Sequence, residues 1–264
     1  MPVASLSLFR IKGAQNRLWM IGQMAMARFA LRKEDDLQFF KLCGSGTGEG
    51  FTPRPNWDVW GIWAVWPDEA TARARTEKGT VWRRWRSRTI ESGDLFLSPI
   101  ASRGSWGRVN PFTPMPDTGK GPMVALTRAQ IKLKHFNSFW SREPEISRRI
   151  GADPNVMFKI GLGEMPLLFQ STFSVWPDTT TMSNFARGNT VHGQAIKSVR
   201  DERWFVEELY ARFRLLGATG SWGGKSLASL LTPAKPGVSP KAAALSAERA
   251  SVGARERAKA RSHY

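Results

Sequence analysis

His192 is the side chain of this sequence whose type and setting best suit metal chemistry. Phe185, His192, Ile196 and Val199 recur at seven-, four- and three-residue intervals, which place them on one apolar face of a helix. We therefore expect the imidazole to cover a sheet or to line a cavity. A neutral imidazole is a common proximal ligand of haem iron. The same spacing also fits a core histidine that makes a single hydrogen bond.

The other potential metal ligands have less favourable settings. His135 stands among lysines at the expected start of a helix, which predicts a surface position, and His263 belongs to the C-terminal tail. Cys43 is the only cysteine, so it excludes an intramolecular disulfide and leaves a thiolate ligand as an alternative. No His/Cys/Asp cluster has the spacing of a zinc site, and no local motif indicates a Ser-His-Asp triad.

Cys43 opens a glycine-rich stretch, CGSGTGEG, that ends at Gly50. It does not fit a dinucleotide-binding motif, because the third glycine of that motif would fall at Glu49 and the stretch leads to a strand rather than a helix. We interpret it as a long loop that serves as a lid or pocket edge. Loop variation without a function is the simpler alternative.

The elements that must position these residues come from an internal repeat. Three motifs recur in the same order, at distances of 118, 110 and 116 residues: 40–42 with 158–160, 65–68 with 175–178, and 104–107 with 220–223. We therefore predict two homologous halves, 1–112 and 122–230, joined by a linker at 113–121 and followed by a disordered basic tail at 231–264. In this alignment Trp82 of the first half stands opposite His192 of the second.

Each half is predicted to follow the βαββαβ order of a ferredoxin-like unit. In the first half, strands are expected at 6–11, around 40, at 59–66 and at 95–102, with helices at 16–35 and 69–90. In the second half, strands are expected at 123–133, 156–161, 168–176 and 205–216, with helices at 135–150 and from 177 to about 203. The predicted fold is α+β, with the two repeats packed sheet to sheet. This arrangement resembles the dimeric α+β barrel superfamily, here within a single chain, and the gap between the sheets is the expected place for a haem.

Composition narrows the class of protein. The chain has 264 residues, 12 tryptophans and a formal net charge of +17, so we expect an anionic partner. No run of 18 apolar residues is present, which excludes a transmembrane helix of ordinary length. The run WRRWRSR at 82–88 suits nucleic-acid stacking in principle, but helical spacing predicts buried indoles and solvated arginines. We expect a cytoplasmic protein.

Three stretches carry a family resemblance: FKLCGSGTGEGFTPRPN at 40–56, WPDEA at 66–70 and EELYARF at 207–213. They resemble the spheroidene monooxygenase family, the acyclic carotenoid ketolases of purple bacteria, and the resemblance extends over roughly 16–224. It implies a haem b enzyme that introduces a keto group at C-2 of an acyclic carotenoid, with dioxygen and reduced ferredoxin. A carotenoid partitions into membranes, so peripheral contact with an anionic membrane is also expected.

Combining the repeat with the resemblance, we predict that His192 binds the iron and that Phe185 and Ile196 pack against the haem. Arg54, Lys159 and Arg212 are the predicted partners of the haem propionates. The resemblance assigns no residue a catalytic role here. Two alternatives remain: a cofactor-free monooxygenase or isomerase of the same barrel superfamily, and a basic nucleic-acid-binding module.

Overall fold

The computed structural model describes residues 1–48, 50, 52–135, 138, 140, 153–164, 169–188 and 204–232. The first half contains four strands and three helices: β1 (Val3–Arg10), α1 (Ala14–Leu31), β2 (Phe39–Gly46), β3 (Pro55–Trp66), α2 (Glu69–Lys78), α3 (Thr80–Arg86) and β4 (Glu91–Gly104). The second contains β5 (Met123–Ile131), η1 (Leu133–His135), β6 (Phe158–Gly163), β7 (Phe169–Trp176), α5 (Thr179–Gly188), β8 (Phe205–Trp222), β9 (Lys225–Ser226) and η2 (Leu227–Leu231).

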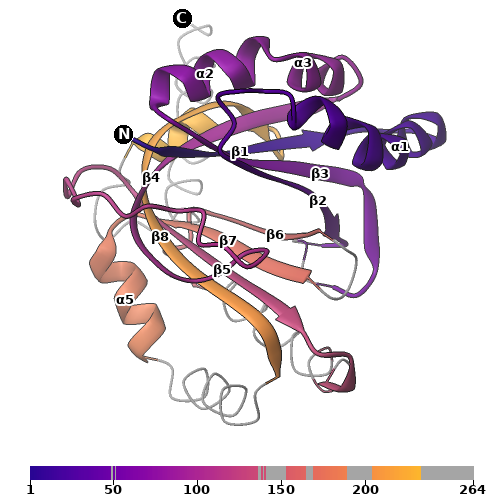
Figure 1. The fold of residues 1–264 in the computed structure, drawn as a ribbon. Helices are drawn as coiled ribbons and strands as arrows, with labels where there is room; N and C mark the ends of the chain where they lie inside the picture. Colours follow the sequence, from indigo (N-terminus) through magenta and orange to yellow (C-terminus); the bar gives the residue numbers. More distant parts are fainter. Residues whose placement is uncertain are drawn as a thin grey trace, which may run out of the picture.

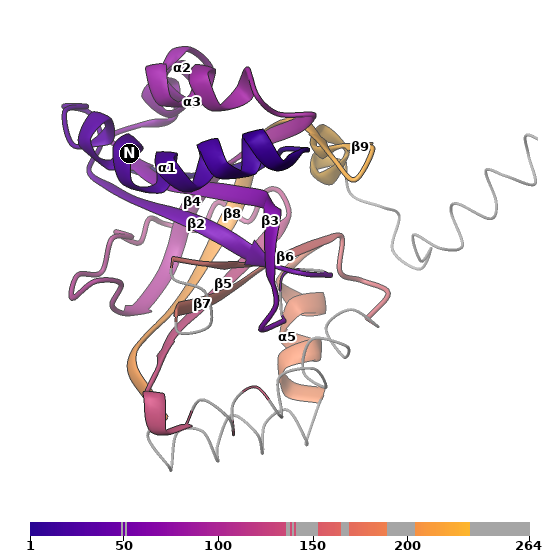
Figure 2. The same ribbon diagram turned by 90° about the vertical axis from the view of Figure 1, so that its right-hand side faces the viewer.

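The strands close into an antiparallel barrel. Their order is β4-β1-β3-β2-β6-β7-β5-β8, and a further pairing of β4 with β8 joins the two ends. Strands β1–β4, the first sheet, and strands β5–β8, the second sheet, have the same internal order when each half is counted separately. Figure 1 shows α1, α2 and α3 outside the first sheet and α5 outside the second, and Figure 2 shows the same arrangement from the side. The predicted α+β barrel within one chain is confirmed.

The barrel interior is filled by side chains. Trp63 lies at its centre, with its ring centroid 5.7 Å from that of Phe173 and 6.0 Å from that of Trp106. Phe112 and Phe213 complete this aromatic cluster. The expectation that a haem would fit in the gap between the two sheets is therefore wrong, because aromatic rings occupy that gap in the described residues.

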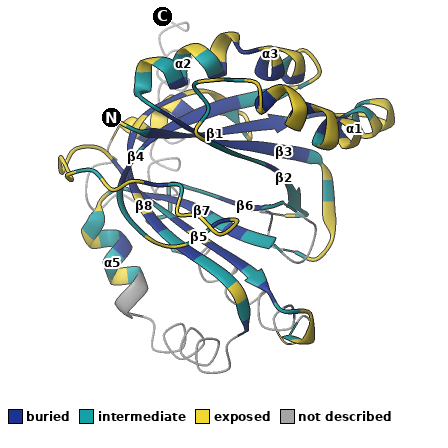
Figure 3. Ribbon diagram, viewed as in Figure 1, coloured by how far each residue is buried: buried dark blue, intermediate teal, exposed yellow. Residues whose placement is uncertain are grey.

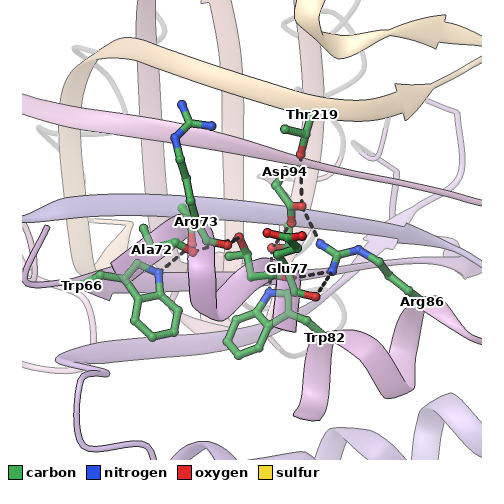
Figure 4. A network of polar contacts seen from close by, with 11 residues as sticks. Trp66, Ala72, Arg73, Glu77, Trp82, Arg86, Asp94 and Thr219 are labelled. Carbon is green, nitrogen blue, oxygen red and sulfur yellow. Dashed lines mark hydrogen bonds and ion pairs between the residues drawn. The ribbon is translucent and has the colours of Figure 1, made fainter. Parts of the chain in front are cut away.

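The helices of the first half close the outward side of the first sheet. The ring of Trp82 in α3 lies tilted against that of Trp66 in β3, with centroids 5.5 Å apart, and its Nε1 donates a hydrogen bond to the Ser7 hydroxyl at 2.8 Å. Beside them, the buried Asp94 carboxylate accepts hydrogen bonds from Arg86 of α3 and Thr219 of β8 (Figure 4). Burial raises the pKa of Asp94 even though the Arg86 guanidinium opposes the shift.

The tryptophans of the run WRRWRSR at 82–88 pack inside the protein. Trp82 and Trp85 are 1% and 0% exposed, so neither indole is available to stack on a nucleic-acid base. Arg83 and Arg84 point to solvent, as helical spacing predicted. This arrangement gives no support to the nucleic-acid alternative.

Three details differ from the sequence-based expectations. The helix expected at 69–90 is divided at Gly79, whose ψ of 140° ends α2, and a Cβ at this position would lie 2.4 Å from the Arg75 carbonyl oxygen. The Phe-Lys motifs align one residue differently, because Phe39 pairs with Val65 as Phe158 pairs with Val175, a distance of 119 rather than 118 residues. Strands β4 and β8 are longer than expected, since they pair with each other to close the barrel. The domain boundaries stay predictions, and the tail from 233 onward lies outside the described residues.

Candidate functional site

The outward side of the second sheet is lined by small and polar side chains. We call these twelve positions the second outer face. They form three cross-strand rows, each running from β6 through β7 and β5 to β8: Lys159, Ser174, Ala125 and Arg212; Gly161, Thr172, Thr127 and Tyr210; Gly163, Gln170, Ala129 and Glu208. Figure 1 shows these four strands on the side of the barrel opposite α1–α3.

The matching face of the first sheet is bulky. Strand register places Trp60, Ile62 and Leu42 where the second sheet has Gln170, Thr172 and Gly161. In the same way, Phe9, Phe40 and Phe96 correspond to Ala129, Lys159 and Arg212. Six large apolar side chains of the first half are thus replaced by smaller or polar ones in the second. The bulky layer that covers the first sheet thus has no counterpart among the side chains of these second-sheet positions.

Helix α5 begins that cover in the same way as α2 does in the first half. The Asp178 carboxylate accepts a hydrogen bond from the Thr181 N–H at 2.7 Å, as Asp68 does from Thr71 at 2.8 Å. Phe185 lies on the inner side of α5, with its ring 5.0 Å from that of Trp176 at the edge of the second outer face. The predicted haem contact Phe185 is therefore placed next to this face.

Two of the three predicted propionate partners lie on the second outer face. Lys159 and Arg212 lie at opposite ends of one row, separated by Ser174 and Ala125. Three strand spacings set their backbones about 14 Å apart. Arg54 instead lies exposed in the loop before β3 and is not part of the second outer face. Lys159 also borders a polar cavity of about 560 Å³, which Arg10, Lys12 and Arg17 line as well.

His192 and Ile196 lie outside the described residues. Their counterpart in the repeat is described, however, and it is informative. Trp82 sits over Ser7 at the centre of the first outer face, and the register equates Ser7 with Thr127 of the second. The residue that aligns with His192 in the repeat therefore covers the centre of its own sheet.

The two weaker ligand candidates behave differently from the expectations. His135 is half-buried rather than at the surface, and its ring stacks on Trp204 with centroids 5.4 Å apart. Its buried Nε2 has no hydrogen-bond partner among the described residues. Cys43 faces the barrel interior, where burial, and secondarily the Glu164 carboxylate, raise the pKa of its thiol well above the ordinary value. A Cys43 thiolate ligand is therefore disfavoured.

A cavity of about 210 Å³ lies at the seam between the two sheets, where β2 and β6 are joined through the single residue pair Gly44 and Gly163. Its wall includes α1, the loop that follows the glycine-rich stretch, and the edge of the second sheet. The lining residues are Ile21, Met24, Arg28, Gly44, Ser45, Gly46, Thr52, Pro53, Pro55, Asn56, Trp57, Trp60, Gly163, Glu164 and Gln170. Gly44, Ser45 and Gly46 of the glycine-rich stretch thus line a pocket edge, but the expectation of a long loop is wrong for 43–46, which form the end of β2 and pair with β3. Because Gly163 and Gln170 belong to both, the cavity is continuous with the second outer face.

A buried ionic cluster closes the barrel end beside this cavity. Arg128, 2% exposed, forms ion pairs with Glu207 at 2.5 Å and with Glu164 at 3.3 Å, and Lys41 pairs with Glu164 at 2.9 Å. Trp106 donates its indole N–H to Glu164. Within the described residues, no group of three or more His, Cys, Asp or Glu side chains is arranged to hold a metal ion.

The closed barrel, the external helices and the small, polar side chains of the second outer face define a single-chain α+β barrel protein with a candidate ligand site in its second half. Two aldoxime dehydratase structures share this fold, with TM-scores of 0.56 and 0.55 at 10% and 8% identity; each alignment covers 81% of this chain, and 81% and 79% of the respective enzymes. No family model matches the chain.

Relatives of known name identify the family more closely. The chain is 56% identical to the spheroidene monooxygenase of Rhodobacter capsulatus, over 85% of this chain and 95% of the relative. It is 45% identical to that of Cereibacter sphaeroides, over 92% and 76%, and 31% identical to that of Rubrivivax gelatinosus, over 79% and 80%. The chain therefore belongs to the spheroidene monooxygenase family.

Proposed function

We propose that this protein is a haem-dependent monooxygenase that introduces a keto group at C-2 of an acyclic carotenoid of the spheroidene type, with dioxygen and reduced ferredoxin. The relatives carry the reaction class, because all three are named for a monooxygenase acting on spheroidene. The structural observation that carries the cofactor is the second outer face, where the bulky layer of the first half is replaced by small and polar side chains.

The residues on this face fit haem b. A flat macrocycle needs a smooth floor. Gly161, Thr172 and Thr127 are three small neighbours in one row, and the large side chain of that row, Tyr210, stands at its β8 end. Lys159 and Arg212, at the two ends of the adjacent row, supply positive charge for two propionates. His192 is the proposed iron ligand, with Phe185 and Ile196 packing at its side. When bound, haem supplies the capacity to activate dioxygen with electrons from the donor.

The protein itself binds and orients the substrate. The seam cavity presents Ile21, Met24, Trp57 and Trp60, which suit the apolar end of a polyene. It opens onto the second outer face through Gly163 and Gln170, so a chain lying in the cavity has its end directed at the proposed haem site. The hydroxyl groups of Thr127, Thr172 and Tyr210 are the polar groups of the floor, and the Tyr210 hydroxyl donates to Glu208 at 3.2 Å.

We also propose a cytoplasmic location with peripheral contact to an anionic membrane, because the substrate partitions into the bilayer and the chain has a net charge of +17. No helix in the described part of the chain is long and apolar enough to cross a membrane.

The test is a hemin titration of the purified protein, followed by absorbance. We expect a Soret band that saturates at one haem per chain, and its loss in His192→Ala. The matched variant is His135→Ala, which removes the other partly buried imidazole. Loss of the band in His135→Ala but not in His192→Ala would move the ligand to His135. A colourless protein that still converts the carotenoid would favour the cofactor-free alternative.

A further inference from the structure

The outward side of α1 is apolar from Leu18 to Phe29. Leu18, Ile21, Met26 and Phe29 are 73, 44, 56 and 66% exposed, although these residue types are usually buried. Gly22 and Ala25 lie exposed between them, and helical spacing places no charged residue of α1 within the strip. Figure 3 shows exposed positions along α1. Over 18 residues the helix is about 27 Å long. We call these six residues the α1 strip.

The opposite side of α1 accounts for its attachment to the barrel. Met20, Gln23, Ala27 and Leu31 are buried against the first sheet and its neighbouring helices. The α1 strip therefore contributes nothing to this packing, and its exposure calls for another explanation. Contiguous apolar surface of this kind marks a site of interaction with another molecule or with a membrane.

The charges around the strip are positive. Arg84 of α3 and Arg88, two residues beyond its end, lie on one side, with their guanidinium groups 5.9 and 5.2 Å from the centre of the Trp19 ring of α1. Arg28 and Arg32 lie exposed on the other side. Within the described ranges, none of these four arginines has an acidic partner at ion-pair distance.

Little negative charge lies near the strip: just beyond the end of α1, Asp35 is exposed and forms no ion pair among the described residues. Helix α1 contains no Asp or Glu. Glu34 and Asp36, which follow it in the sequence, both form ion pairs with Arg75 of α2. An apolar strip framed by unpaired arginines matches an anionic bilayer, where apolar side chains enter the acyl region and cations meet the headgroups.

The seam cavity lies at the edge of the strip. Ile21 belongs to both, and Trp57, which is 44% exposed, stands at the cavity wall. In the outward row below, Trp60 and Gln170 flank the paired glycines Gly44 and Gly163. Because the two glycines have no side chains, the surface at this point is shallow, and it connects the region below α1 with the second outer face.

We propose that the α1 strip docks on an anionic lipid bilayer, with its helix axis parallel to the membrane, and that the seam cavity is the port through which the end of an apolar polyene leaves the bilayer. The docking stands on the exposure and charge of α1 alone. The identity of the cargo rests on the proposed function.

The test is flotation of the purified protein with lipid vesicles, which requires neither haem nor carotenoid. Vesicles of phosphatidylcholine alone are compared with vesicles of phosphatidylcholine and phosphatidylglycerol in equal parts. We expect binding to the anionic vesicles that weakens as salt is added. Leu18→Ser/Phe29→Ser should lower the partition coefficient by about tenfold or more, because two large side chains no longer enter the bilayer.

Two further variants separate the contributions. Arg84→Gln/Arg88→Gln should weaken binding to the anionic vesicles by about fivefold for each charge removed. Leu133→Ser is the matched control, because Leu133 is 76% exposed but lies in η1, far from α1 in Figures 1 and 2, and this variant should float like the original protein. Thermal unfolding of each variant verifies that it is folded.

Three outcomes would overturn the docking surface: no flotation with anionic vesicles, equal flotation of Leu18→Ser/Phe29→Ser, or a dimer in sedimentation that this double variant dissociates while vesicle binding persists. The last would show that α1 meets a second copy of the chain. Flotation by a protein that does not convert carotenoid would instead contradict the proposed function and leave the docking surface standing.

Discussion

Replacing Glu207 by glutamine should lower the free energy of unfolding of the protein, and the size of this loss should depend on pH. The Glu207 carboxylate, 12% exposed, accepts hydrogen bonds from the N–H groups of Gly107 and Arg108 at 3.0 and 2.6 Å, and from Ser105 at 2.8 Å. It also forms the 2.5 Å ion pair with the buried Arg128. Arg108 has a φ of 69°, unusual for a residue with a side chain, so Glu207 also holds a strained loop in place.

The size of the effect follows from the pKa of this carboxyl group. Burial alone would raise it, but the hydrogen bonds from Arg108, Gly107 and Ser105 and the Arg128 guanidinium prevail and lower the pKa from 4.5 to about 2. Such a difference corresponds to about 3 kcal/mol of unfolding free energy. Since the pKa in the folded protein is depressed, this stabilisation is complete above about pH 5 and is lost as the pH falls towards 2.

Urea unfolding at pH 7 and pH 3 measures this contribution. Glu207→Gln should lose about 3 kcal/mol at pH 7 and about half of that at pH 3. At pH 3 the Glu207 carboxyl is protonated in the unfolded chain, so holding it ionised in the folded protein contributes less stability. Glu208→Gln is the control, since Glu208 points to the outer side of β8 and should change the stability by less than about 0.5 kcal/mol. Equal losses for Glu207→Gln at both pH values would refute the electrostatic explanation.

Two further predictions address the site and the repeat. Gln170→Trp/Thr172→Ile restores the first-half residues on the second outer face; we expect the Soret band after hemin addition to be lost while the thermal midpoint stays equal or rises, and undiminished haem binding would argue against this face as the site. Gly104→Ala and Gly220→Ala occupy equivalent positions, with φ of 97° and 77° and a new Cβ 2.1 and 2.2 Å from the carbonyl oxygens of Glu208 and Ser92. Each substitution should lower the free energy of unfolding by about 1–3 kcal/mol, measured with urea. The control is Gly13→Ala, where φ is 93° but no atom lies within 4 Å of the new Cβ, and it should lower this free energy less. An equal loss for all three variants would show that the contacts of the new Cβ do not matter.

The repeat was readable because its motifs sit where the fold tolerates few alternatives. The Trp-Pro-Asp motifs end a strand and begin a helix in both halves, with Asp68 and Asp178 as the capping residues. Gly104 and Gly220 carry the positive φ that side chains resist. Local chemistry of this kind depends on neighbours in the sequence, so it allows strand order and helix starts to be predicted from residue types.

The location of the candidate site was not readable in the same way. Alternating apolar residues reveal that a strand has two faces, but not which face turns into the barrel. The pairing of β4 with β8 closes the barrel, and this closure places Trp63 and Phe173 in its interior. Because these rings fill the interior, the candidate site lies on the outer face instead. The one-residue shift between Phe39 and Phe158 likewise became visible only through their pairing with Val65 and Val175.

Residue types and spacing thus specified the duplicated architecture and the family, and they singled out His192 and the glycine-rich stretch, because these signals are local or repeated along the chain. The three-dimensional arrangement alone revealed the loss of six bulky side chains from the second outer face, the cavity at the Gly44–Gly163 seam and the apolar strip of α1. Each of these depends on side chains from distant segments that meet, or fail to meet, when the barrel closes, and such contacts leave no periodic trace in a sequence.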